Sequence, residues 1–321
     1  MERGDQAFRK SDASGRWPEM GYAGALSFLR RPYSRDVAQA DVVVSGVPFD
    51  GATSNRAGCR FGPRAIRAAS AETAQLKAFP WGFDPFDHLR VIDWGDAWVD
   101  PHDPGSVPGE IEAHAAAILE GGARMLTFGG DHFISYPLLK AHAAVHGPLA
   151  LVQFDAHGDL WPDRPGTLDH GTMMGRAVTE GVVDAAHSVQ IGIRTFHDED
   201  MGLEILTAPF VHREGAAAVI EALRARVGDR PIYISFDIDV LDPAAAPGTG
   251  TPVPGGLASW QALEILRGMA GLRLVGMDLV EVSPPYDVSE ITAIAAATVA
   301  HDWLCLLAEE KGAQRVPVGR L

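Results

Sequence analysis

The chain reads Leu-Ala-Leu-Val-Gln-Phe-Asp-Ala-His-Gly-Asp from residue 149 to residue 159. A short, mostly apolar run of this kind is typical of a strand that is buried on both faces of a parallel sheet. In an extended chain residues i, i+2 and i+4 point the same way, so Asp155, His157 and Asp159 are expected to share one face. The stretch therefore predicts a buried strand that ends in a group of metal-ligand side chains.

The same arrangement occurs twice more along the chain. Gly-Gly-Asp-His at 129–132 and Asp-Ile-Asp at 237–239 each follow an apolar run, and they add His132, Asp237 and Asp239. Four crowded carboxylates at buried strand ends would repel each other and lose hydration, and divalent cations remove that cost. Six ligands, with carboxylates able to bridge, suit two metals about 3.5–4 Å apart. We therefore expect a two-metal hydrolytic site; hydrogen-bonded polar groups without a metal are the competing interpretation.

The ligand set consists of carboxylates and imidazoles without a thiolate, which favours Mn(II), with Co(II), Ni(II) or Fe(II) as alternatives. Four aspartates balance two divalent ions, so the site would tolerate a small cationic substrate. Glu281 ends another apolar strand and is expected either to pair with a planar cation such as a guanidinium or to form a structural salt bridge. His170 follows in the next loop, where it would relay protons or cap a helix.

Apolar strand patterns alternate with helical patterns throughout the chain. Strands are expected at 41–47, 90–93, 125–128, 149–154, 188–193, 232–236 and 273–280, with a further short one at 205–211. Helices are expected at 63–77, 110–121, 136–146, 171–180, 214–227, 259–269 and 289–309. This alternation predicts an α/β fold with a parallel sheet covered on both faces, in which ligands gather at the carboxyl ends of the strands. Two loops rich in Gly and Pro, 51–62 and 242–256, are expected to lie near that edge.

Size and charge limit the remaining possibilities. With 321 residues and 46% apolar content, we expect one domain over 1–321, in which residues 1–35 form an N-terminal extension packed on the domain or on a neighbouring subunit. A formal charge of -15 disfavours nucleic acid or an anionic membrane as partner. A polar N-terminus and only two cysteines favour a cytoplasmic protein with reduced thiols. The apolar stretch 291–308 is expected to be a buried helix.

Taken together, the motifs resemble those of the ureohydrolase family, which includes arginases and agmatinases. The segments that carry the resemblance are Gly-Gly-Asp-His, Asp-Ala-His-x-Asp, Ser-Phe-Asp-Ile-Asp-x-Leu-Asp-Pro and Gly-Thr-Gly-Thr-Pro, and it extends from 45–50 to 291–297. It implies a three-layer α/β/α fold around a mainly parallel eight-stranded sheet (arginase/deacetylase-like), a binuclear manganese centre and a homo-oligomer, either a trimer or a hexamer. One metal would be held by His132, Asp155, Asp159 and Asp237, and the other by Asp155, His157, Asp237 and Asp239. Gly158 departs from the Thr, Ser or Asn of many relatives.

Within that family, the segments 52–58, 79–81 and 169–173 look most like those of bacterial agmatinases. The resemblance implies hydrolysis of agmatine to putrescine and urea. Asp159 would orient the attacking water, Glu281 would hold the guanidinium, and His170 would pass a proton to the departing amine. The alternatives are another guanidino substrate such as 4-guanidinobutanoate, a single-zinc deacetylase, and a non-catalytic regulatory member. The role of the loop at 161–166 in specificity stays open.

Overall fold

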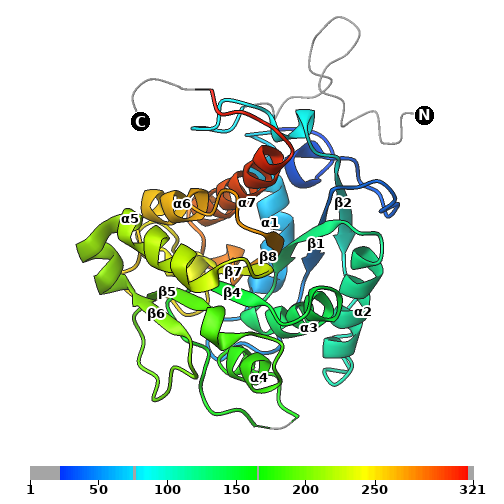
Figure 1. Cartoon of the computed structure of the whole chain (residues 1–321). Helices are drawn as coiled ribbons and strands as arrows, with labels where there is room; N and C mark the ends of the chain where they lie inside the picture. The colour runs from blue at the N-terminus through cyan, green and yellow to red at the C-terminus, as the bar shows by residue number, and fades with distance from the viewer. Residues whose placement is uncertain (1–21, 75–76, 165, 317–321) are drawn as a thin grey trace, which may run out of the picture.

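The computed structural model describes residues 22–74, 77–164 and 166–316 (Figure 1). Eight strands form one sheet in the order β2-β1-β3-β8-β7-β4-β5-β6, and every neighbouring pair is parallel. The strands are β1 Val42–Val47, β2 Val91–Asp96, β3 Arg124–Gly129, β4 Ala150–Phe154, β5 Val189–Ile193, β6 Glu204–Thr207, β7 Ile232–Asp237 and β8 Leu274–Val280. The expected parallel sheet of eight strands is confirmed.

Helices cover both faces of the sheet and bury its side chains. They are α1 Gly62–Ser70, α2 Val107–Leu119, α3 Ser135–His146, α4 Met173–Thr179, α5 Ala208–Val227, α6 Ser259–Arg267 and α7 Ile291–Glu310. Helices α1, α5, α6 and α7 pack on one face, and α2, α3 and α4 pack on the other (Figure 1). These layers are the three-layer α/β/α arrangement that the resemblance implied.

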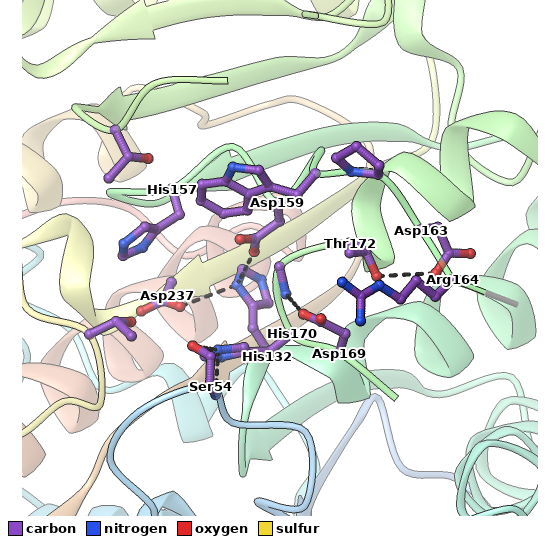
Figure 2. A pocket seen from close by; sticks show the side chains of 15 residues that line it. Ser54, His132, His157, Asp159, Asp163, Arg164, Asp169, His170, Thr172 and Asp237 are labelled. Atoms are coloured by element: carbon purple, nitrogen blue, oxygen red, sulfur yellow. Dashed lines mark hydrogen bonds and ion pairs between the residues drawn. The ribbon is translucent and has the colours of Figure 1, made fainter. Parts of the chain in front are cut away.

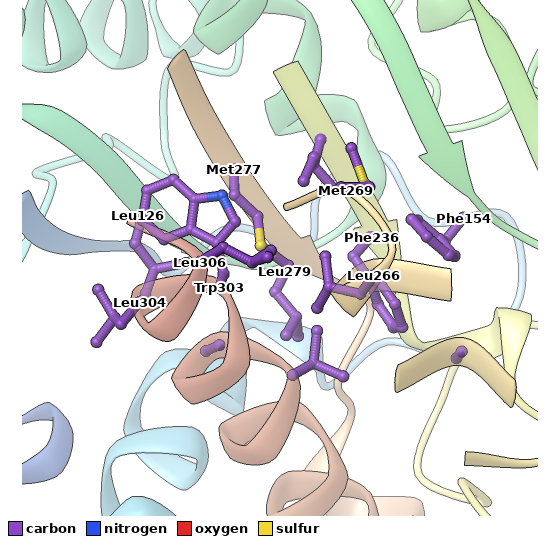
Figure 3. Packing of buried hydrophobic residues seen from close by; sticks show 14 of the residues in the cluster. Leu126, Phe154, Phe236, Leu266, Met269, Met277, Leu279, Trp303, Leu304 and Leu306 are labelled. Carbon is purple, nitrogen blue, oxygen red and sulfur yellow. The ribbon is translucent and has the colours of Figure 1, made fainter. Parts of the chain in front are cut away.

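Strand β7 shows how the sheet divides the core. Ile232, Ile234 and Phe236 belong to the apolar cluster under α7, while Tyr233 belongs to the cluster on the opposite face. This alternation follows from the two-residue period of a strand. Figure 3 shows the first cluster, where Trp303 of α7 lies among side chains of the central strands. Both faces are therefore closed to solvent, and only the strand ends are free to carry chemistry.

The central strands end at the same level. Phe154 of β4 pairs with Phe236 of β7, and Leu279 of β8 pairs with both Phe236 and Phe128 of β3. The carboxyl ends of β3, β8, β7 and β4 therefore form one continuous edge. This register brings the three ligand-bearing segments together although they are far apart in the sequence.

Two expected elements differ from the structure. The strand expected at 205–211 ends at Thr207, and residues 208–211 already belong to α5. The reason is local, because the Thr207 side chain accepts a hydrogen bond from Phe210 N–H (3.3 Å) and a proline occupies the first turn. The helix expected at 63–77 ends at Ser70 and continues as turns, and residues 75–76 lie outside the described residues.

The N-terminal end of the described chain packs against the sheet. Phe28 lies edge-on to Phe128 with ring centroids 4.9 Å apart, and its N–H donates to Asp93 (2.8 Å). The rest of the predicted extension, residues 1–21, lies outside the described residues. Of the helices described here, α7 alone is long and apolar enough to cross a membrane, but 78% of that span is buried inside the protein, which fits the expected core helix.

Candidate metal centre

The six predicted ligands lie at the carboxyl edge of the central strands. Asp155 directly follows β4, Asp237 is the last residue of β7, and His132 begins a short 3-10 helix after β3. The extended run expected from Asp155 to Asp159 is wrong, because β4 ends at Phe154 and Asp159 has a φ of 53°. A loop that turns back, rather than a shared strand face, carries these side chains inward.

Two groups of ligand atoms form within this cluster. His132, Asp155 and Asp237 make one group, and Asp155, His157 and Asp239 make the other, with all atoms of each group within 4.8 Å of one another. Asp155 belongs to both groups. Asp159 belongs to neither, but its Oδ2 lies 3.0 Å from His132 Nδ1. A carboxylate common to two adjacent groups is the arrangement that a binuclear site requires.

The protonation of His132 provides a test of whether a cation fits. Ser235 Oγ donates to Asp278 Oδ1 (2.8 Å), so it accepts the proton on His132 Nε2 (2.8 Å). Nδ1 of His132 then faces the ligand cluster, and it makes no hydrogen bond in this buried position. Three carboxylate oxygens surround it at 3.0–3.2 Å. Burial lowers the pKa of His132, but Asp155, Asp159 and Asp237 outweigh it and raise that pKa well above its ordinary value, so a proton resides on Nδ1 when no metal is bound. A divalent metal can replace this proton between the imidazole and the carboxylates, so these residues fit such an ion.

The pKa values of several side chains in the cluster are raised above their ordinary values. Burial raises the pKa of Asp159 to about 6, and the charge of Asp155 adds to this shift. Burial and the charges of Asp239 and Asp155 raise the pKa of Asp237 well above its ordinary value. Burial opposes the charged form of His157 as well, but Asp239 outweighs it and raises the pKa of His157 to about 12. Without metal the cluster holds protons, which bound cations must displace.

Residues behind the ligands hold them in place. Gln153 Nε2 donates to Asp155 Oδ2 (2.7 Å), and Arg194 Nη2 donates to the carbonyl of Asp239 (2.6 Å). Neither these residues nor the Ser235–Asp278 pair were expected from the sequence. A signal was present for two of them, because Gln153 and Ser235 are polar residues inside apolar strand runs. Such outer partners orient a ligand and tune its basicity.

The space beside Gly158 is filled by another side chain. A Cβ added to Gly158 would meet the imidazole of His197, 2.6 Å from Nε2. The carbonyl of Gly158 accepts a hydrogen bond from Gln190 Nε2 (2.6 Å). The loop between His157 and Asp159 is therefore supported by His197 packing and a backbone contact.

Glu281 and His170 form a second polar group beside the ligands. Glu281 Oε1 accepts the backbone N–H of His132 (2.9 Å) and the Nδ1–H of His170 (2.9 Å). Glu281 is 1% exposed, and its other oxygen, Oε2, is buried with no hydrogen-bond partner among the described residues. His170 Nε2 accepts the N–H of Ser54 (3.0 Å) and lies 2.7 Å from the Ser54 hydroxyl. Although burial lowers the pKa of His170, Glu281 raises it to about 9.

A cavity of about 760 Å³ opens onto these groups. Figure 2 shows His157, Asp159, Asp237, His132 and His170 around it. Both loops that the sequence placed near this edge contribute to the wall, since Ser54 comes from 51–62 and Thr251 comes from 242–256. All the predicted site residues therefore lie in or directly behind one cavity.

Comparisons with known proteins agree with this geometry. The family model described as the arginase family matches residues 40–305. An agmatinase of Chromobacterium violaceum is 56% identical over 97% of each chain, and one of Escherichia coli is 50% identical over 90% of this chain and 95% of its own length. The crystal structure of a hypothetical agmatinase from Burkholderia thailandensis superposes with a TM-score of 0.92 at 57% identity, covering 96% and 98% of the two chains. Proclavaminate amidino hydrolase from Streptomyces clavuligerus superposes with a TM-score of 0.87 at 40% identity, covering 90% and 99%.

Proposed function

Because this chain belongs to the arginase family, whose enzymes use a binuclear metal site, we propose that it hydrolyses agmatine to putrescine and urea. The observation that carries the proposal is the free oxygen of Glu281, buried beside two groups of metal-ligand atoms that share Asp155. A buried carboxylate oxygen without a partner favours a ligand that supplies a hydrogen-bond donor. The planar guanidinium of agmatine supplies it.

The proposed metal ligands extend the two groups of atoms, by Asp159 in the first and by Asp237 in the second. His132, Asp155, Asp159 and Asp237 would hold one ion, and Asp155, His157, Asp237 and Asp239 would hold the other. Once bound, two divalent ions supply a water nucleophile that is activated near neutral pH. The oxygen-rich ligand set supports Mn(II), with Co(II), Ni(II) and Fe(II) as the other ions that it suits.

Glu281 would orient the guanidinium. Its Oε1 is already committed to His132 N–H and to His170, so the incoming N–H groups meet Oε2. Because Glu281 is fixed by those two hydrogen bonds, the central carbon of the guanidinium is held facing the ligand cluster. Such orientation lowers the entropic part of the barrier.

Asp159 and His170 would handle the protons. Asp159 lies against the cluster with a pKa raised to about 6 by burial, so it accepts a hydrogen bond from the nucleophile and orients it. His170 is anchored to Glu281 through Nδ1, and its Nε2 is held at the cavity wall by the N–H and the hydroxyl of Ser54. In the reaction Nε2 would exchange its contact with the Ser54 N–H for a proton, which then passes to the amine that leaves when the C–N bond breaks.

We also expect a homo-oligomer, a trimer or a hexamer, in the cytoplasm. An apolar groove of about 330 Å³ along α6 and α7, where Ile291 and Ile294 are 38% and 39% exposed, supports self-association. Two free, buried thiols, Cys59 and Cys305, support a reducing compartment. Nucleic acid is not an expected partner, because the net charge is -15.

A second candidate substrate is 4-guanidinobutanoate, whose tail is a carboxylate. The exposed guanidinium of Arg164 lines the same cavity and would favour an anionic tail. The purified protein loaded with Mn(II) should therefore be assayed with agmatine, 4-guanidinobutanoate and arginine, with urea as the product measured. Urea from agmatine, at the highest kcat/KM of the three, is the expected result. Absence of urea from agmatine with two metal ions bound per chain would overturn the proposal.

A further inference from the structure

The cavity has two chemically different ends (Figure 2). His157 and Asp237 lie at one end, while Asp163, Arg164 and Asp169 lie at the other. The guanidinium must lie at the first end, where the ligand cluster and Glu281 are. The remainder of the substrate therefore extends toward the second end, where its tail is recognised.

Among the described residues, four aspartates line this cavity: Asp159, Asp163, Asp169 and Asp237. Asp159 and Asp237 contact His132 within the ligand cluster. Asp163 forms a two-point ion pair with Arg176, with N–O distances of 2.6 and 2.9 Å. Its charge is therefore already neutralised.

Asp169 is the remaining carboxylate. Its Oδ1 accepts the backbone N–H of Gly171 (2.8 Å), and no cationic side chain in the described part of the chain is paired with it. Its neighbour His170 is turned away toward Ser54 and Glu281. One oxygen thus fixes the carboxylate, and the other is left for a ligand.

On the basis of the function proposed above, we propose that Asp169 determines specificity by binding the terminal ammonium of the substrate. A half-buried carboxylate with a free oxygen is a strong acceptor for a primary ammonium. The same charge would repel a carboxylate tail. Arg164 would act in the opposite direction, but it is more exposed than Asp169, so solvent and salt screen it more strongly.

Trp161 provides the wall between the two ends. Its ring centroid lies 6.1 Å from that of His157, and its backbone N–H donates to the carbonyl of Gly171 (3.1 Å). A Cβ added to Gly171 would lie 3.0 Å from Trp161 Cε3, so the indole is packed tightly on this glycine. Gly171 therefore holds both the apolar wall and, through its N–H, the carboxylate. Such a wall suits the methylene chain that joins a guanidinium to an ammonium.

The test uses three substrates that differ in the charge of the tail: agmatine (cationic), n-pentylguanidine (neutral) and 4-guanidinobutanoate (anionic). Asp169→Asn should lower kcat/KM for agmatine by about 10- to 100-fold, mostly through KM, and change that for n-pentylguanidine by less than about threefold. The ratio of kcat/KM for agmatine to kcat/KM for 4-guanidinobutanoate should fall by a corresponding factor. Circular dichroism and metal content of each variant verify that the fold and the metal site are retained.

Asp163→Asn is the matched control, because it removes a carboxylate of the same cavity that is already paired. Any loss that it causes should be the same for agmatine and n-pentylguanidine. An equal loss for both substrates in Asp169→Asn, or no loss for either, would overturn the assignment of Asp169 while leaving the proposed function intact. If the wild-type protein released no urea from agmatine, the proposed function would fail first, and the assignment of Asp169 would fail with it.

Discussion

The two ends of the cavity are built from different kinds of backbone. The metal-ligand end lies on the carboxyl edge of β3, β4 and β7, where His132, Asp155 and Asp237 are at most 3% exposed. The tail end lies on a loop, where Trp161 is 37% exposed. The ends of buried strands thus position the proposed metal ligands, and the loop carries the residues proposed for substrate choice. A loop can change without disturbing the sheet, so specificity can vary over an unchanged centre.

The largest effect is expected at the metal-ligand end. Asp159→Asn removes the proposed hydrogen-bond acceptor for the nucleophile and should lower kcat by roughly 10²- to 10⁴-fold, with little change in the melting temperature. Steady-state urea release and thermal unfolding measure the two quantities. Asp198→Asn, on an exposed part of the surface, serves as the control and should keep wild-type turnover. Turnover within a few fold of wild type in Asp159→Asn would remove Asp159 from the mechanism.

The next effect tests the support behind the ligands. Asp278 is fully buried and accepts hydrogen bonds from Ser235 (2.8 Å) and Tyr233 (2.9 Å). Asp278→Asn should disturb the Ser235 hydroxyl that fixes the tautomer of His132, and it should weaken Mn(II) binding by about 10- to 100-fold. Calorimetric titration of the metal-free protein with Mn(II) measures this directly.

Tyr233→Phe removes the other hydrogen bond to Asp278 and is the matched control. It leaves Ser235 in place, so Mn(II) affinity should stay close to that of the wild type. Equal metal affinities for Asp278→Asn and Tyr233→Phe would show that the contact through Ser235 does not orient His132.

A smaller effect is expected at the tail end. Trp161→Ala removes the apolar wall and should raise KM for agmatine by about tenfold, because each methylene that loses contact costs up to about 0.8 kcal/mol. The kcat should change little, since the ligand cluster is untouched. Trp161→Phe keeps an aromatic surface and should restore most of the affinity. A large fall in kcat with an unchanged KM would instead place Trp161 in the reaction.

The smallest effect concerns Gly158, the glycine between His157 and Asp159. Gly158→Ser would push its Cβ against His197 and should cost about 1–2 kcal/mol of unfolding free energy by overpacking. The double variant Gly158→Ser/His197→Ala should recover most of that loss, which a double-mutant cycle in urea would measure. Simple additivity of the two single changes would show that the contact is not the cause.

The local part of this architecture was predictable from the sequence, and the long-range part was not. Apolar runs followed by Asp and His predicted the sheet and the candidate ligands. Both features can be recognised within a few consecutive residues, because a buried strand is an apolar run and the ligands follow it directly. The contacts of Ser54 with His170 and of His132 with Ser235 span 116 and 103 positions. They depend on the order in which the strands pair, which residue spacing alone does not specify.

Local patterns gave a wrong prediction where a strand signal and a helix signal overlapped. Ile-Leu-Thr-Ala-Pro-Phe-Val at 205–211 is apolar enough for a strand, but Thr207 caps a helix that begins at Ala208. The loop from Asp155 to Asp159 shows the opposite case, since the predicted residues do meet although the backbone is not extended there. Side-chain chemistry was thus a better guide to the site than the expected backbone conformation.

One hydrogen bond connects occupancy at two positions. The backbone N–H of His132 donates to the same Glu281 oxygen that receives His170. The imidazole of His132 is a proposed metal ligand, while its main chain holds the carboxylate that is proposed to bind the guanidinium. Thermodynamic linkage then requires reciprocity. If the bound ions raise the affinity for a guanidinium by some factor, a bound guanidinium raises the affinity for the ions by the same factor. Dialysis against a chelator should therefore strip the ions more slowly when a guanidinium compound is present.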